Sequence, residues 1–260
     1  MADAFLTKYG PVALVTGASS GIGRSFAALL AAKGFDLVLV ARRVERLEQL
    51  AAEFTAKHKV NVKVVPVDLA GVNAAAEMLE ATAGLDVGLV VSNAGFGLRG
   101  WHEDHPPAGL NEMLMVNCNT PMLLANGFIP RLKARGKGGI IFVSSVEALL
   151  GVPFSAGYSA SKGFMNRLGE ALWAELTPHG LDILTVCPGA TDTEALARAG
   201  MDAKAVPNVM SPDDVGRLAL ENIANGPVYL PSPHYKAMFE KLAAMPQRDA
   251  LTAMAAGVPK

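Results

Sequence analysis

The stretch Thr16-Gly17-Ala18-Ser19-Ser20-Gly21-Ile22-Gly23 joins a short β-branched run at residues 12–16 to a helical pattern at residues 21–33. Its glycines follow the spacing Gly-x-x-x-Gly-x-Gly. Glycine permits positive φ and a close approach of other backbone, and the free N–H groups at a helix start bind phosphate. The stretch therefore predicts the phosphate-binding turn of a dinucleotide site, with a plain strand-to-helix turn as the alternative.

Short apolar runs alternate with longer helical patterns along the rest of the chain. Further strands are predicted at residues 36–41, 62–67, 87–92, 139–144, 183–187 and 228–230. Helices are predicted at residues 44–57, 70–83, 108–135, 156–177 and 234–255, the last interrupted at Pro246, and another starts at Ser211-Pro212. Continuous apolar strands between helices indicate a parallel sheet covered on both faces. The predicted fold class is α/β, a single doubly wound Rossmann-fold domain with about seven parallel strands.

The sequence indicates one domain with two additions. No internal repeat, linker or low-complexity tract divides the 260 residues, so we expect a single domain over residues 1–260. Residues 189–208 form a long segment without strand character, which is typical of a substrate loop. Residues 232–260 are predicted to form a C-terminal helical tail.

Composition excludes several classes of partner. The net charge of -1 gives no electrostatic reason to expect nucleic acid or an anionic membrane. No apolar run reaches about 18 residues without a charge, glycine or proline, so we expect no membrane span. Residues 1–11 lack a signal-peptide pattern. Cys118 and Cys187 lie in apolar segments and are predicted to be buried free thiols, which fits a reducing compartment. A cytoplasmic protein is therefore the expectation.

The end of the second predicted strand indicates which dinucleotide binds. NAD-binding folds place a carboxylate there, about 20 residues past the glycine turn, to bind the ribose hydroxyls. This chain has Ala41-Arg42-Arg43 instead, so no carboxylate repels a 2′-phosphate and two guanidinium groups can pair with it. NADP(H) is therefore favoured over NAD(H), although the two arginines also suit a solvated helix start. Asp68, after the third strand, suits the adenine amino group and the N-cap of the next helix equally well.

Tyr158 and Lys162 stand four residues apart in a predicted helix, so they share one helix face. A free phenol has a pKa near about 10 and a free ammonium near about 10.4, so neither exchanges protons readily at neutral pH. A fixed positive charge lowers the pKa of a phenol, and a tyrosine tuned in this way can exchange a proton with a substrate oxygen. On spacing alone, such a pair is more often a solvated helix face.

Taken together, the motifs resemble the short-chain dehydrogenase/reductase family over residues 10–230. The matching motifs, in the family's order, are residues 16–23, Asn93-Ala94-Gly95, Asn117, Ser144-Ser145, Tyr158-x-x-x-Lys162 and Pro188-Gly189. The family's serine lies thirteen residues before the tyrosine, which selects Ser145 over Ser144. The resemblance implies NAD(P)-dependent interconversion of an alcohol and a ketone or aldehyde.

The resemblance also implies a role for each catalytic residue. Tyr158 gives a proton to the developing alkoxide in reduction, or removes it in oxidation. Lys162 lowers the pKa of Tyr158 and binds the nicotinamide ribose. Ser145 donates to the substrate oxygen, which stabilises developing charge. Asn117 holds a water that connects the lysine to solvent, with a buried asparagine that kinks its helix as the alternative.

Other motif residues are expected to contact the cofactor. Asn93 should hold the fourth strand to its neighbours, Gly95 should let the cofactor approach, and Thr191 should meet the nicotinamide carboxamide. No metal ion is expected. The full set of predicted cofactor-binding residues is Gly17, Ser19, Ser20, Gly21, Ile22, Gly23, Arg42, Arg43, Asp68, Leu69, Asn93, Ala94, Gly95, Tyr158, Lys162, Pro188, Gly189 and Thr191.

Three features depart from the family pattern. Glu147 stands where the family has a small residue, and it either faces the substrate cleft or lies exposed on a loop. Trp101-His102-Glu103-Asp104-His105 looks like a metal cluster, but loop histidines are more often solvated, and this loop can border the substrate entrance. The tail after Pro231-Ser232-Pro233 puts the family's tetramer in doubt. Because the helix at residues 156–177 is apolar on more than one stripe, we expect a homodimer, with a tetramer as the alternative.

We therefore expect an NADP(H)-dependent oxidoreductase whose partner is a small-molecule carbonyl or alcohol substrate of ketone, ketosteroid or ketoacyl type. An apolar substrate is indicated by side chains in segments near the expected cleft, which are Phe96, Leu149, Leu150, Val152, Phe154 and Met201. One alternative is a regulatory protein that senses NADP without turnover, which would usually lack the tyrosine or the lysine. Another is a sugar-nucleotide epimerase or dehydratase, which would usually have another glycine spacing and a larger substrate domain.

Overall fold

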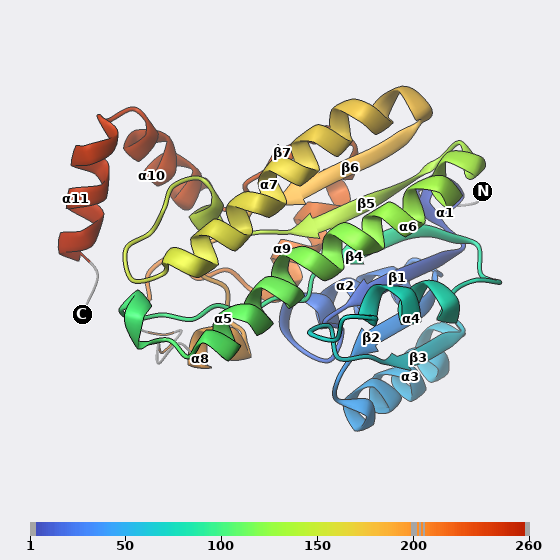
Figure 1. Ribbon diagram of the computed structural model, residues 1–260. Helices are drawn as coiled ribbons and strands as arrows, with labels where there is room; N and C mark the ends of the chain where they lie inside the picture. Colours follow the sequence, from blue (N-terminus) through green and yellow to red (C-terminus); the bar gives the residue numbers. More distant parts are fainter. Residues whose placement is uncertain (1–3, 199–201, 203, 205, 258–260) are drawn as a thin grey trace.

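A seven-stranded parallel sheet forms the centre of the computed structural model, which describes residues 4–198, 202, 204 and 206–257 (Figure 1). The strand order is β3-β2-β1-β4-β5-β6-β7, and every neighbouring pair is parallel. The strands are β1 Val12–Thr16, β2 Asp36–Ala41, β3 Val62–Pro66, β4 Val87–Ser92, β5 Gly138–Val143, β6 Leu181–Val186 and β7 Val228–Tyr229. The order reverses between β1 and β4, and sheets of this kind bind ligands at that switch point.

Helices cover both faces of the sheet, as the apolar strands predict. The helices on the first face are α2 Gly21–Ala32, α3 Val44–His58 and α9 Pro212–Glu221. Those on the second face are α4 Ala74–Ala81, α6 Thr120–Arg135 and α7 Ala156–Leu176. Shorter or peripheral helices are α1 Ala4–Tyr9, α5 Pro107–Leu114, α8 Glu194–Arg198, α10 Pro233–Ala243 and α11 Gln247–Gly257. Single turns of other helix types are η1 His102–Asp104, η2 Met115–Asn119, η3 Val146–Ala148, η4 Thr177–His179 and η5 Ile223–Asn225. The prediction of a single α/β domain is confirmed.

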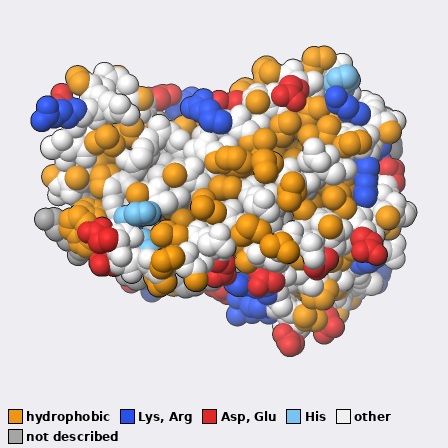
Figure 2. Space-filling view, in the orientation of Figure 1, with side chains coloured by type: hydrophobic (Ala, Val, Ile, Leu, Met, Phe, Trp, Pro, Cys, Tyr) orange, Lys and Arg blue, Asp and Glu red, His pale blue; other side chains and the backbone are white. Residues whose placement is uncertain are grey.

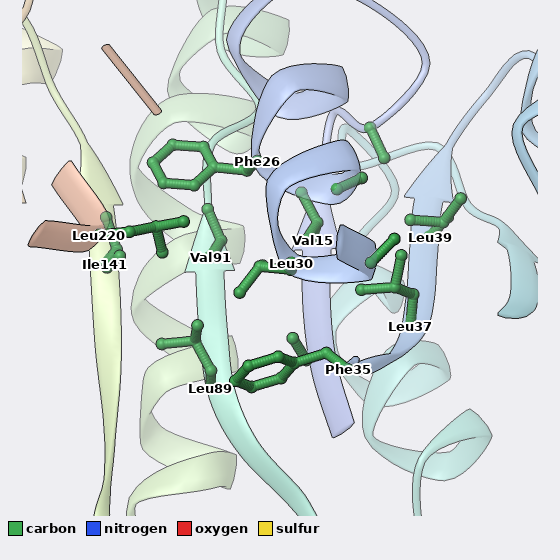
Figure 3. Close-up of a cluster of buried hydrophobic side chains, with 14 of the residues drawn as sticks. Val15, Phe26, Leu30, Phe35, Leu37, Leu39, Leu89, Val91, Ile141 and Leu220 are labelled. Atoms are coloured by element: carbon green, nitrogen blue, oxygen red, sulfur yellow. The ribbon is translucent and has the colours of Figure 1, made fainter. Parts of the chain in front are cut away.

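The core consists of two apolar layers, one on each face of the sheet. In the first layer, Phe26 and Leu30 of α2 point onto the sheet, where they meet Val15, Leu89 and Val91 of β1 and β4 (Figure 3). All five side chains are fully buried. Protein interiors pack at the density of organic crystals, so this layer fixes the position of α2 on the sheet. The turn between β1 and α2 is thereby held at the switch point.

The helix predicted at residues 108–135 is interrupted, so this prediction was wrong in its centre. α5 ends at Leu114, and the π-helical turn η2 separates it from α6. Asn117 lies in that turn and is buried. Single π-helical turns inside helices occur frequently at functional sites.

Two other local predictions can be compared with the structure, and one helix was missed. α1 was not predicted, because six residues are too few to show a helical period. The helix start at Ser211-Pro212 is confirmed, since Ser211 Oγ accepts from Asp214 N at 3.0 Å. The segment predicted to lack strand character contains α8 and an isolated parallel bridge between Thr191 and Met210.

The tail helices α10 and α11 (red in Figure 1) lie beyond the carboxyl ends of the strands, at the end of the molecule opposite α1. Pro246 separates them, as predicted. Along the described part of the chain, no helix is both long and apolar enough to cross a membrane. Both cysteines are free thiols, and Cys187 is buried.

Candidate active site

Hydrogen bonds fix the glycine turn to the ends of β1 and β4. Thr16 Oγ1 accepts from the backbone N–H groups of Asn93 (3.0 Å) and Ala94 (3.1 Å), and Asn93 Nδ2 donates to Thr16 O (2.9 Å). A Cβ on Gly23 would lie 2.5 Å from Asn93 Nδ2 and would overlap the carbonyl group of Gly17, so only glycine fits there. Asn93 therefore holds β4 to β1, as expected.

The first turn of α2 faces the carboxyl end of the sheet. Ser20 is its N-cap residue, but the Ser20 hydroxyl accepts from Arg43 Nη2 at 2.7 Å instead of from the helix. Gly17 and Gly21 adopt φ values of +67° and +53°, which favour glycine. Ile22 packs against the first core layer and anchors the turn. Helix N-termini with free N–H groups bind anions, so the turn fits the pyrophosphate of a dinucleotide.

Arg43 reaches the glycine turn and Arg42 does not. The Nε and Nη2 atoms of Arg43 donate to Ser19 Oγ at 3.1 and 2.9 Å. A guanidinium group beside two hydroxyls is a donor set suited to a phosphate. Arg42 instead lies 3.3 Å from Glu112 Oε1 in an exposed ion pair. The predicted pair of arginines is thus divided, because Arg42 pairs with Glu112 while Arg43 turns to the serine hydroxyls.

Asp68 lies exposed just past β3, and the alternative that it caps the next helix was wrong. Asn73 is the N-cap residue of α4, which begins at Ala74 and not at residue 70. Asp68 Oδ1 accepts from Ala70 N at 3.2 Å and so closes a local turn. The neighbouring Leu69 is buried, and its carbonyl oxygen accepts from Thr120 Oγ1 at 2.8 Å.

Ser145, Tyr158 and Lys162 come together at the carboxyl end of β5. The ring of Tyr158 lies on Gly97, where a Cβ would be 2.9 Å from ring carbons. The Ser145 hydroxyl lies close enough to the Tyr158 phenol to lower the pKa of that phenol. Ser144 instead donates from its hydroxyl to Lys162 O at 3.1 Å. Of the two serines, Ser145 therefore faces the phenol, in agreement with the thirteen-residue spacing.

Lys162 of α7 is buried, and its side chain lies against the segment after β4. Its Nζ donates to Val143 O at 2.8 Å. A Cβ on Gly95 would lie 3.0 Å from that Nζ and 3.1 Å from Asn117 Oδ1. The ammonium group and the amide oxygen therefore face the same narrow space over Gly95, two residues past Asn93.

Asn117 connects the π-helical turn to the segment after β4. Its Nδ2 donates to Phe96 O at 2.8 Å and to Ser161 Oγ at 3.0 Å, and its Oδ1 accepts from Phe96 N at 3.1 Å. The helix is distorted at this residue, so the alternative of a buried asparagine in an irregular helix describes its local structure.

The electrostatics of Tyr158 differ from the expectation. Burial raises the pKa of Tyr158 to about 12, the negative charge of Glu147 adds to this rise, and the nearby Ser145 hydroxyl and the charge of Arg99 oppose it. Burial also lowers the pKa of Lys162 to about 8. Lys162 is not among the groups that lower the pKa of Tyr158, so the expected effect of Lys162 on the phenol is not found. Lys162 Nζ turns toward Val143 O and lies 5.7 Å from the Tyr158 ring centroid.

The motif after β6 completes this end of the sheet. Pro188 O accepts from Val146 N at 3.0 Å, which joins the motif to the turn after Ser145. A Cβ on Gly189 would overlap the ring of Tyr235 in α10. Thr191 is buried, and its Oγ1 donates to Gly189 O at 3.0 Å. The tail helix α10 thus forms part of the wall beside this motif.

Comparison with known proteins agrees with this geometry. The family model described as short chain dehydrogenase matches residues 11–204. The chain belongs to the short-chain dehydrogenase family. It is therefore an oxidoreductase that binds a nicotinamide cofactor, and its relatives are named dehydrogenases and reductases acting on hydroxyl and carbonyl groups.

The similarity to other short-chain dehydrogenases extends over almost the whole chain. A 7beta-hydroxysteroid dehydrogenase from Clostridium sardiniense is 32% identical over 246 residues, which are 94% of each protein. A solved structure of a 7beta-hydroxysteroid dehydrogenase has a TM-score of 0.89 at 27% identity and covers 96% of this chain and 99% of its own. A short-chain dehydrogenase from Sphingobium yanoikuyae, solved in complex with NADPH, has a TM-score of 0.83 at 31% identity and covers 96% and 97%.

Beside the predicted catalytic residues of this short-chain dehydrogenase lies an ion pair between Arg99 and Glu147. The side chain of Glu147 is 12% exposed, so it faces inward and the exposed-loop alternative was wrong. Ser159 Oγ also donates to Glu147 Oε2, at 3.4 Å. Sequence reasoning singled out Glu147 from its departure from the family pattern but missed Arg99, which no local pattern distinguishes from other loop arginines.

The loop that resembles a metal cluster lies at the rim of the site. Residues 101–104 are exposed, and within the described ranges no three metal-ligating side chains come together. The ring of Trp101 stands edge-on to Phe154 with centroids 4.9 Å apart, and Gly100 N donates to Phe154 O at 2.9 Å. Trp101 and Leu149 remain 49% and 40% exposed, which leaves an apolar rim. Met201, also expected near the cleft, lies outside the described residues.

Proposed function

We propose that this short-chain dehydrogenase interconverts a bulky apolar ketone and the corresponding secondary alcohol, with NADP(H) as its cofactor. The observation that carries the proposal is the convergence of Ser145, Tyr158 and Lys162 beside a glycine turn that fits a pyrophosphate. A cofactor-sensing protein has no need of this complete set. An epimerase or dehydratase is disfavoured by the absence of a larger substrate domain from the described residues.

The protein's own residues would position the substrate and move its proton. When bound, the nicotinamide cofactor supplies or accepts the hydride. Ser145 would donate to the substrate oxygen, and Tyr158 would deliver its phenol proton to that oxygen in reduction. The raised pKa of Tyr158 keeps the phenol protonated at neutral pH, which suits reduction. Lys162 and Asn117 face one space over Gly95, which supports a path for replacing that proton.

The preference for NADP(H) rests on Arg43. Its guanidinium group lies on the hydroxyls of Ser19 and Ser20, at the end of β2 where the adenosine ribose of such cofactors binds. A guanidinium with two hydroxyls recognises a phosphate dianion better than it recognises a neutral diol. The NADPH complex of the Sphingobium yanoikuyae relative is consistent with this preference. Asp68, exposed past β3, remains our proposed contact of the adenine amino group.

The substrate class rests on the apolar rim and on the relatives. Trp101, Leu149 and the half-buried Phe96 and Phe154 line the segments around Tyr158, which favours a bulky apolar body. Relatives are named 7beta-hydroxysteroid dehydrogenase, and a hydroxysteroid is a substrate with a bulky apolar body. A steroid ketone is therefore our first proposed substrate class, ahead of simple ketones and ketoacyl thioesters.

We also propose a homodimer in the cytoplasm. Exposed apolar side chains on α5, α6 and α7 support pairing of these helices across a two-fold axis. Two unpaired cysteines support a reducing compartment.

A coupled spectrophotometric assay tests the proposed function. NADPH and NADH oxidation would be measured with steroid ketones, bulky aryl ketones, ketoacyl thioesters and keto sugars under one set of conditions. We expect turnover with NADPH and the highest kcat/KM for a steroid or other bulky ketone. Turnover of the keto sugars alone, or none with any ketone, would contradict the proposal.

A further inference from the structure

Glu194, the first residue of α8, holds two arginines beside the glycine turn. Its Oε2 lies 2.8 Å from Nη1 of Arg43, and its Oε1 lies 2.5 Å from Nη1 of Arg46. The two hydrogen bonds to arginine hold the pKa of Glu194 at about 2, so the carboxylate is charged at any working pH. Three charged side chains thus form a compact cluster at the end of β2. Its carboxylate, Glu194, comes from a segment more than 140 residues away in sequence.

The same Arg43 is the proposed ligand of the 2′-phosphate. Its Nε and Nη2 donate to the serine hydroxyls of the turn, and its Nη1 is directed to Glu194. Because Nε and Nη2 already donate to Ser19, the edge of the guanidinium group left for bidentate pairing with a phosphate is the one that carries Nη1 and Nη2, where Ser20 and Glu194 lie. A carboxylate and a phosphate repel each other at such short range, so they cannot share the guanidinium group.

Thr193, the residue before Glu194, shows that the start of α8 lies over the glycine turn. A Cβ on Gly21 would be 3.0 Å from Thr193 Cγ2. Thr193 therefore lies at the helix N-terminus and Glu194 at Arg43, which are the two places where the protein would bind the phosphates of a dinucleotide. Arg42 pairs with Glu112 instead. Among the described residues, this exposed pair makes no contact with Thr193 or Glu194.

We propose that Glu194 is an internal competitor for the 2′-phosphate of NADP(H), which occupies Arg43 and Arg46 in the free protein and is displaced when the phosphate binds. The inference rests on the proposed function, because it takes Arg43 as the 2′-phosphate ligand. Glu194 thereby sets how strongly the enzyme distinguishes NADP(H) from NAD(H). Arg46 is the second cation that the displaced carboxylate releases to the phosphate.

Calorimetric titration with adenosine 2′,5′-bisphosphate and with 5′-AMP tests the inference without turnover. Glu194→Gln removes the charge and keeps the size of the side chain. Exposed ion pairs contribute little each, so removing two competing pairs should tighten bisphosphate binding by about 3- to 30-fold. Binding of 5′-AMP, which has no 2′-phosphate, should change by less than about twofold. Glu112→Gln breaks the exposed pair with Arg42 and is the matched control, for which neither affinity should change.

Two results separate the inference from the function on which it rests. If wild type prefers the bisphosphate and Arg43→Ala abolishes that preference, but Glu194→Gln leaves or weakens bisphosphate binding, Glu194 is no competitor and the inference is overturned alone. If neither wild type nor Glu194→Gln prefers the bisphosphate over 5′-AMP, the 2′-phosphate site itself is refuted, and the proposed cofactor with it.

Hydrogen exchange gives a second measurement on the wild-type chain. Saturating bisphosphate should speed amide exchange in α8, because Glu194 is released, although a bound ligand usually slows exchange. Saturating 5′-AMP should leave the exchange of α8 unchanged. Slower or unchanged exchange of α8 with the bisphosphate would overturn the displacement of Glu194.

Discussion

Two charged side chains act in opposite directions on the phenol of Tyr158. Glu147 raises the pKa of Tyr158, and Arg99, its ion-pair partner, lowers it. Because Glu147 is largely buried, its charge is screened less than a surface charge would be. If Tyr158 is the proton donor that we propose, this pair of residues sets the pH range over which its phenol stays protonated.

Glu147→Gln should therefore move the alkaline limb of the pH profile for ketone reduction to lower pH. The substitution removes the negative charge that favours the protonated phenol, so Tyr158 loses its proton at a lower pH. The measurement is kcat/KM for NADPH-dependent reduction as a function of pH. Arg99→Gln removes the opposing charge and should move the same limb to higher pH. Shifts of the two variants in the same direction would contradict this account.

Single residues also show how far sequence reasoning reached. Ser145 and the Tyr158–Lys162 pair were identified because several motifs follow one another in the family's order and spacing, and the structure brings them together. Arg42 and Arg43 could not be told apart, because the direction of each side chain depends on the partners it finds, Glu112 and Glu194, in distant segments.

At the scale of elements, α7 must lie very close to β6 to bring Tyr158 and Lys162 to the end of the sheet. Gly169 makes this approach possible, since a Cβ there would overlap Thr185 Oγ1 and lie 3.3 Å from Thr185 Cβ. Both residues are buried, so no flexible side chain can move aside.

Gly169→Ala should lower the free energy of unfolding by about 1–3 kcal/mol, the usual cost of overpacking a core. The measurement is the midpoint and slope of urea unfolding followed by circular dichroism. Gly163→Ala in the same helix is the control, because its Cβ would meet only Ala148 O at 3.8 Å. That control should keep or raise stability by up to about 1 kcal/mol, since alanine favours helix over glycine. Equal losses in both variants would show that crowding against β6 is not the cause.

The elements that sequence predicted well are those whose signal is local and repetitive. β1, β2 and β4 have the predicted bounds, because their apolar runs end at a glycine, an arginine and an asparagine, respectively. The π-helical turn at Asn117 was not predicted, since the hydrogen bonds from Asn117 to Phe96 that accompany it join segments 21 residues apart. α1 was also missed, because its position depends on packing of Phe5 against Phe35 and on the bond from Tyr9 to Asp182.

At the scale of the whole molecule, an apolar surface lies over α5, α6 and α7. Leu114, Met122, Leu123 and Phe164 remain 37–48% exposed. Figure 2 shows hydrophobic side chains gathered on the face where α6 and α7 run in Figure 1. Met165 and Leu176 of α7 are buried in the core, so α7 has apolar side chains both inward and outward, as predicted. This exposed apolar surface supports the proposed pairing of two copies of the chain.

Sedimentation equilibrium at micromolar concentration should therefore give twice the chain mass of 27.1 kDa. The double variant with Leu123→Glu and Phe164→Glu should sediment as a monomer, because two charges would be buried in the interface without partners. Val72→Glu, at a 79% exposed apolar residue before α4, is the control and should remain a dimer. A wild-type monomer would refute the proposed assembly.

The central claim for the whole enzyme is that Tyr158 delivers the proton to the substrate oxygen. The most direct measurement is the rate of NADPH oxidation by Tyr158→Phe with the best ketone of the panel, beside the affinity for NADPH measured by fluorescence. A positioned general acid contributes about 10²–10⁴-fold, so kcat should fall by that factor while NADPH affinity changes by less than about threefold. A Tyr158→Phe variant that oxidises NADPH at the wild-type rate would contradict the account.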